Sequence, residues 1–85
     1  MPKTLWSEAQ ATLVEALVQA RKAAGLSQAA LAARLRCQQS LIARIESGER
    51  RIDAVELVVL ARAVGADPAA ILRRLAEAVP PDAGL

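Results

Sequence analysis

The segment from Gly25 to Gly48, GLSQAALAARLRCQQSLIARIESG, decides the fold of this chain. It holds two short helical patterns separated by a connection of a few residues, and Ser27 is a favoured N-cap for the first. The second pattern covers about residues 39–47, and Gly48 is a typical helix end. We therefore expect two helices that bury one face each. Their inward apolar residues are Leu31, Leu35, Ile42 and Ile45.

The outer face of the second helix is polar from its first turn. Gln38, Gln39 and Ser40 open it, and Arg44 follows one turn later on the same side. Such side chains suit base edges, because glutamine pairs bidentately with adenine and arginine with guanine. The pattern is typical of a helix-turn-helix, in which the first helix braces and the second lies in the major groove of DNA.

Three further helices are expected around this motif, and capping residues mark where each begins. Two of them open with a capping box, and the last opens with a cap followed by proline. In chain order they cover about residues 7–24, from a capping box of Ser7 and Gln10; residues 53–64, from one of Asp53 and Glu56; and residues 68–79, from the Asp67-Pro68 start.

These patterns predict an all-α fold, a compact five-helix bundle that forms a single domain over residues 1–85. The helix-turn-helix core covers about residues 27–47. Composition agrees, because alanine and leucine are abundant and both favour helices. Small side chains also pack helices closely, so a large ligand pocket is not expected. The last helix is expected to turn Ile71, Leu72 and Leu75 toward the core.

The inventory of reactive residues argues against an enzyme. The chain has no histidine, no tyrosine, one cysteine and no glycine-rich phosphate loop. No acidic cluster has the spacing of metal ligands, so neither a metal nor another cofactor is expected. No apolar run is long enough to span a membrane, and no signal peptide is present. We expect a cytoplasmic protein that reaches the nucleoid through DNA.

Positive charge is concentrated in the middle of the chain. The net charge is +2, but residues 21–51 carry seven basic and two acidic residues, whereas the remainder carries four basic and seven acidic ones. A basic middle between acidic ends is expected of a protein that turns one face toward an anion. The alternative is an ordinary solvated run of charges. The seven basic residues are Arg21, Lys22, Arg34, Arg36, Arg44, Arg50 and Arg51.

Four strings carry a family resemblance: Arg21-Lys22-Ala23-Ala24-Gly25-Leu26-Ser27-Gln28; Leu31-Ala32; Gln39-Ser40-x-Ile42-x-Arg44-Ile45-Glu46-x-Gly48-Glu49-Arg50; and Leu60-Ala61-Arg62-Ala63-Val64-Gly65. In spacing, caps and charge the chain resembles the Cro/phage-repressor (XRE) helix-turn-helix family over roughly residues 17–75. The resemblance implies a lambda-repressor-like domain and sequence-specific DNA binding. It also implies a homodimer and transcriptional control, which are usual in the family.

The resemblance also implies roles for individual residues. Arg21 and Glu46 would form a structural salt bridge between the first helix and the end of the recognition helix. Gln28 would hold a phosphate and steady that helix. By the resemblance, Gln39, Ser40 and Arg44 are expected base contacts, and Gln28, Arg50 and Arg51 are expected phosphate contacts. We add Gln38, beside this face, as a base contact. Arg34 and Arg36 are added as phosphate contacts, with a purely solvated role as the alternative.

Several positions depart from the family pattern. Arg36 replaces the usual turn glycine, which requires either a different bend or a left-handed arginine. Gln38 replaces the common Ser or Thr cap, which weakens the helix start and frees Gln38 for DNA. Leu41 replaces a small polar residue and either meets a thymine methyl or edges the core. Cys37, in the same turn, is interpreted as a small hydrophobe or as a redox switch.

The last departure, Val59, is apolar where the family often has a charge. Val55 lies one turn before it, so the helix carries a second apolar stripe in addition to its core face. This stripe favours homodimerisation, with two recognition helices about one DNA turn, roughly 34 Å, apart. The alternative is that Val59 covers a neighbouring helix within the monomer. The candidate interface residues are Val55, Val59, Leu72 and Leu75.

The sequence therefore predicts a regulator of transcription that binds double-stranded DNA sequence-specifically. A repressor that binds a palindromic operator as a homodimer is the favoured form, because a small bundle can block polymerase by occupancy alone. One alternative is an antitoxin-like protein, or another regulator, that acts chiefly through a protein partner. Another is a pure protein-interaction module that has kept the fold.

Overall fold

The computed structural model describes the backbone of residues 2–85 and the side chains of residues 8–85. The described backbone is helical apart from its turns and connections, which confirms the predicted all-α fold with five helices. Four of the five helices, α2 to α5, begin within a residue of the positions that the sequence predicts. The helices are α1 (Pro2–Ala23), α2 (Gln28–Leu35), α3 (Gln39–Glu46), α4 (Ala54–Ala63) and α5 (Pro68–Ala78).

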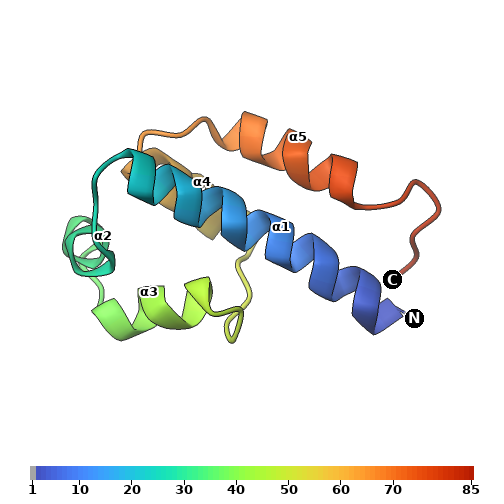
Figure 1. Ribbon diagram of the computed structural model, residues 1–85, viewed down its shortest axis with the longest axis horizontal. Coiled ribbons are helices and arrows are strands. Elements are labelled where there is room, and N and C mark those ends of the chain that lie inside the picture. The colour runs from blue at the N-terminus through green and yellow to red at the C-terminus, as the bar shows by residue number, and fades with distance from the viewer. Residues whose placement is uncertain (1) are drawn as a thin grey trace.

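The long helix α1 organises the bundle (Figure 1). It packs along α5 and also contacts α3 and α4, while α2 packs against α3. In the view of Figure 1, α3 lies on the opposite side of α1 from α5. The helix-turn-helix lies toward one end of the bundle, where α3 contacts α1 and α2 contacts α4.

All five helices contribute to one apolar core. Ile42 and Ile45 are the buried residues of α3, as the sequence pattern predicts, and they hold the inner side of that helix against α1 and α2. Because both residues are buried on one side of α3, its opposite face points outward. The core residues are Leu13, Ala16, Leu17, Leu31, Ala32, Ile42, Ile45, Leu57, Leu60, Ala61, Val64 and Ile71.

Two expectations about the outer helices were wrong. The first helix begins at Pro2 rather than Ser7, because proline is well suited to a first helical turn; the side chain of Ser7, and with it the expected capping box, lies outside the described residues. Leu72 is 54% exposed instead of facing the core. The inner positions of α5 follow a spacing of four from Ile71 to Leu75, and Leu72 is rotated away from that stripe.

Arg36 ends α2 in a left-handed conformation, with φ of 57°. Its N–H donates to the carbonyl of Ala33 at 3.2 Å, and the next N–H, of Cys37, donates to the carbonyl of Ala32 at 3.0 Å. Gly25 ends α1 through the same hydrogen-bond pattern. The chain therefore keeps the turn geometry of a glycine while placing an arginine there. A left-handed L-residue costs about 1–2 kcal/mol.

Replacing Arg36 by glycine should therefore stabilise the fold. We expect Arg36→Gly to raise the free energy of unfolding by about 1 kcal/mol, because the relief of strain exceeds the entropy that glycine adds to the unfolded chain. Urea denaturation followed by circular dichroism measures the change. The matched control is Ala33→Gly, an exposed position within α2 where no strain is relieved, and it should lower stability by about 1 kcal/mol. A destabilised Arg36→Gly protein would contradict the claim that the left-handed Arg36 is strained.

Candidate nucleic-acid interface

The outward face of α3 is polar along its length. Gln38, Gln39, Ser40 and Arg44 are all exposed, and the buried isoleucines lie behind them. Gln38 occupies the N-cap in an extended conformation but makes no side-chain bond to the helix backbone. Instead its Oε1 accepts a long hydrogen bond, 3.4 Å, from the hydroxyl of Ser40. The first turn of α3 therefore presents three adjacent polar side chains to solvent.

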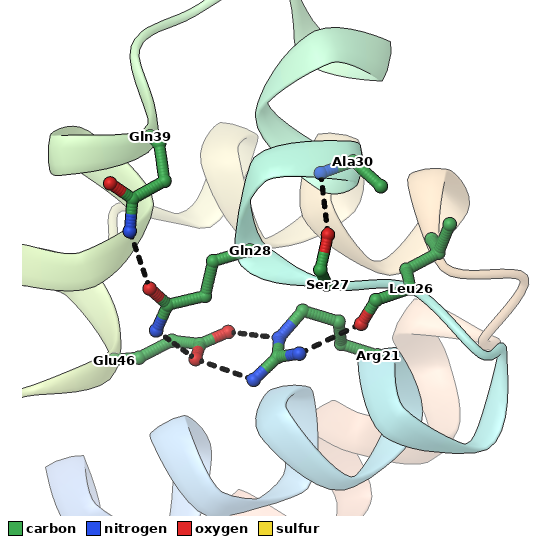
Figure 2. A network of polar contacts seen from close by, with 7 residues as sticks. All are labelled: Arg21, Leu26, Ser27, Gln28, Ala30, Gln39 and Glu46. Carbon is green, nitrogen blue, oxygen red and sulfur yellow. Dashed lines mark hydrogen bonds and ion pairs between the residues drawn. The ribbon is translucent and has the colours of Figure 1, made fainter.

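An ion pair connects α1 to the end of α3 (Figure 2). Arg21 Nε donates to Glu46 Oε2 at 2.7 Å, and a second guanidinium nitrogen donates to Glu46 Oε1 at 2.9 Å. The remaining terminal nitrogen donates to the carbonyl of Leu26, at 2.8 Å. The two side chains are only 10% and 11% exposed. This bidentate geometry fixes both side chains and sets the position of α3 relative to α1.

Two glutamines extend this pair toward the outer surface. Gln28, the first residue of α2, donates from Nε2 to Glu46 Oε1 at 2.9 Å. Gln39, the first residue of α3, donates from Nε2 to Gln28 Oε1 at 2.7 Å. Figure 2 shows the continuous chain of hydrogen bonds from Arg21 through Glu46 and Gln28 to Gln39. The first residues of both helices of the motif are thus tied to the buried ion pair.

The environment of Glu46 keeps its carboxylate ionised. Burial by itself raises the pKa of Glu46, but the hydrogen bonds from Arg21 and Gln28 and the positive charge of Arg21 outweigh it, and the net pKa lies below the ordinary value. The pKa of Arg21 shifts in the opposite direction, upward, because of its hydrogen bond to Glu46. At neutral pH, Glu46 is therefore a hydrogen-bond acceptor and not a donor.

Two arginines of the basic middle of the chain make contacts within the fold. Arg34 donates to the carbonyl of Ala63, the last residue of α4, at 3.0 Å. Arg50 forms an ion pair with Glu56 at 2.7 Å, which also lowers the pKa of Glu56. Neither contact was foreseen, because sequence spacing does not reveal which elements meet in space.

Arg36 and Arg44 differ from Arg34 and Arg50. Both side chains are exposed and form no hydrogen bond or ion pair with the rest of the described chain. Arg36 ends α2, and Arg44 lies on the outward face of α3 beyond Gln39 and Ser40. Their positive charge therefore stays available at the surface of the helix-turn-helix, whereas the guanidinium groups of Arg21, Arg34 and Arg50 also hold the fold together.

Two partly buried apolar side chains lie in the turn between α2 and α3 and in the first turn of α3. Leu41 and Cys37 both pack against the core. Leu41 thus edges the core, one of its two expected roles. Cys37 is a free cysteine whose position fits the interpretation as a small hydrophobe.

Three apolar side chains on α4 and α5 are exposed. Val55 is 73% exposed and Val59 48%, and Leu72 on α5 is 54% exposed. Leu75 differs from them, because it packs against the core of its own chain. The apolar stripe expected on α4 therefore lies at the surface.

The geometry described so far defines a helix-turn-helix domain with a polar outer helix. The general model of the helix-turn-helix domain matches residues 12–76 of this chain. A solved structure, described as an XRE-family like protein from Pseudomonas syringae pv. tomato str. DC3000, is similar at 40% sequence identity and a TM-score of 0.84. The match covers 92% of this chain and 95% of that one. Among curated proteins, no sequence matches.

The chain therefore belongs to the XRE family of helix-turn-helix proteins, as its sequence resemblance indicated. This is a family of DNA-binding regulators and not of enzymes. Within the described residues, no group of three or more potential ligands could hold a metal ion. None of the helices searched is both long enough and apolar enough to cross a membrane.

Removing one partner of the buried ion pair should destabilise the fold strongly. We expect Arg21→Met to lower the free energy of unfolding by about 3 kcal/mol, because it leaves a partly buried carboxylate without its charged partner. Urea denaturation measures this loss. Arg50→Met is the matched control, since it breaks an ion pair whose side chains are about one third exposed, and it should cost much less. Equal losses for the two variants would contradict a special role for the buried pair.

Proposed function

We propose that this protein is a transcriptional regulator that reads double-stranded DNA with α3 in the major groove. The observation that carries the proposal is the outward polar face of α3, which two buried isoleucines hold in one orientation. Base edges in the major groove are distinguished by their donors and acceptors, and this face offers both. The proposed base contacts are Gln38, Gln39, Ser40 and Arg44.

Phosphate contacts surround this face in the proposed complex. Arg36 and Arg44 carry charge that no described group neutralises, and Gln28 opens α2, where backbone N–H groups also attract phosphate. Arg34 and Arg50 would add positive charge while keeping their contacts within the fold. Such contacts are independent of sequence and sensitive to salt. The proposed phosphate contacts are Gln28, Arg34, Arg36, Arg50 and Arg51.

A homodimer on a palindromic operator is the proposed form of the complex. One small domain contacts few base pairs, and a second copy one DNA turn away, roughly 34 Å, doubles the site. The exposed apolar residues Val55, Val59 and Leu72 support an interface through α4 and α5. Leu75 is left out, because it packs within its own chain. Such a dimer would act as a repressor by occupying DNA in the cytoplasm.

The same apolar residues favour one second candidate function. An antitoxin-like protein, or another regulator that acts chiefly through a different protein, would also expose Val55, Val59 and Leu72 on its surface. The two candidates differ in what covers these residues, a second copy or another protein.

Selection from a random-sequence DNA duplex pool tests the main proposal. The protein should enrich a palindromic sequence, and its affinity for that sequence should fall about a thousandfold between 50 and 200 mM salt. Gln39→Ala and Arg44→Ala should each relax the base preference at one position by about 1–3 kcal/mol. Arg51→Ala should weaken all sequences alike, and Arg74→Ala, on α5 outside the basic middle, is the control. No enriched sequence would refute the proposal.

The oligomeric state tests the interface separately. The protein should sediment as a dimer, and Leu72→Glu should convert it to a monomer, because burying the new carboxylate would be costly. Sedimentation equilibrium measures the change. Ala70→Glu is the matched control, an exposed position on a different face of α5, and should leave the dimer intact. A monomeric wild-type protein would exclude this interface and favour the second candidate.

A further inference from the structure

The hydrogen bonds between Arg21 and Gln39 converge on the carboxylate of Glu46. Arg21 donates to it from one side, and on the other side Gln39 donates to Gln28, which donates to Glu46. Glu46 is ionised and can only accept, so the Gln28 amide must turn its Nε2 toward it. Gln28 Oε1 then faces Gln39, and because this oxygen can only accept, Gln39 must turn its own Nε2 toward Gln28. The buried carboxylate therefore decides the orientation of two amides that would otherwise be free to turn over.

This orientation leaves Gln39 with a defined outer edge. One of its two amide protons is used for Gln28, so one N–H donor and the Oε1 acceptor remain. Figure 2 shows Oε1 directed away from Gln28. The exposed edge of Gln39 thus combines one acceptor with one donor in a fixed arrangement.

We propose that Arg21 and Glu46 are positioning residues that set the base preference of α3 by fixing the donor and acceptor of Gln39. This inference rests on the proposed function, because it concerns how the same face reads DNA. Neither residue lies on the outward face of α3. Their influence passes through Gln28 at the first residue of α2.

The fixed edge of Gln39 favours adenine over guanine. In the major groove adenine presents the N6 amino donor beside the N7 acceptor, which complements one acceptor and one donor. Guanine presents two acceptors, O6 and N7, and the Oε1 of Gln39 would oppose one of them. With the Gln39 amide turned over, its Nε2 would face outward with both protons, and guanine would no longer be disfavoured.

The ion pair is suited to this task because it is itself immobile. Arg21 donates to both oxygens of Glu46 and, from its remaining terminal nitrogen, to the carbonyl of Leu26. All three guanidinium nitrogens therefore make hydrogen bonds. Held in this way, the carboxylate keeps an acceptor oxygen directed at Gln28. The same bonds connect α1, the start of α2 and both ends of α3, so the orientation is set by three helices at once.

Glu46→Gln tests the inference without a large change in side-chain size. The new amide has an acceptor oxygen and a donor NH₂ group, so it no longer requires Nε2 of Gln28 to face it. Selection from the random duplex pool first identifies the base pair whose preference Gln39→Ala removes. At that base pair, we expect Glu46→Gln to lower the preference for adenine over guanine about tenfold. The preferences at other positions should stay as in the wild type.

Two further variants separate positioning from stability. Glu56→Gln removes the same charge from the Arg50 ion pair, which has no link to Gln39, and it should keep the adenine preference even where overall affinity changes. Gln28→Leu breaks the connection while leaving the ion pair in place. It should reduce the adenine preference as Glu46→Gln does, so it provides the test if Glu46→Gln does not fold.

The outcomes distinguish this inference from the proposed function. If the wild-type protein enriches no sequence, the proposed function fails and the inference fails with it. If the wild type enriches a sequence but Glu46→Gln keeps the adenine preference, only the inference is overturned. The same holds for Gln28→Leu, which takes the place of Glu46→Gln if that variant does not fold. A loss of preference confined to the base pair assigned to Gln39 supports it, because a purely structural role would affect all positions together.

Discussion

The bidentate ion pair between Arg21 and Glu46 is the interaction on which the helix-turn-helix depends. It joins α1 to the end of α3 across a partly buried site, where a carboxylate without its partner would be costly. Replacing such a pair by apolar residues is often neutral for stability, so its value lies more in geometry than in energy. The pair gives α3 one position and, through Gln28 and Gln39, gives its first side chain one orientation.

The basic residues of this protein serve two different purposes, which charge counting alone does not separate. Arg21, Arg34 and Arg50 hold elements together, by an ion pair with Glu46, a bond to the end of α4 and an ion pair with Glu56. Arg36 and Arg44 keep their charge at the surface of the motif.

The local features of the fold were predictable because they depend on neighbouring residues. Ser27 caps α2, and Asp53 forms with Glu56 the capping box that begins α4. The spacing of the isoleucines located the inner side of α3 for the same reason. The start of α1 was mispredicted, because proline favours the first turn of a helix. The exposure of Leu72 was mispredicted, because a leucine one position from the inner stripe is easily assigned to that stripe.

By itself, the sequence determined the helices, their caps and which face of each is apolar, because these follow from residue propensities and helical periodicity. The family resemblance added the pairing of Arg21 with Glu46. Only the tertiary structure decided that Gln28 lies between Glu46 and Gln39, and that Arg34 reaches α4. Hydrogen-bond direction depends on which atoms meet after the helices pack, and residues 11 to 29 positions apart in the chain carry no local signal of that meeting.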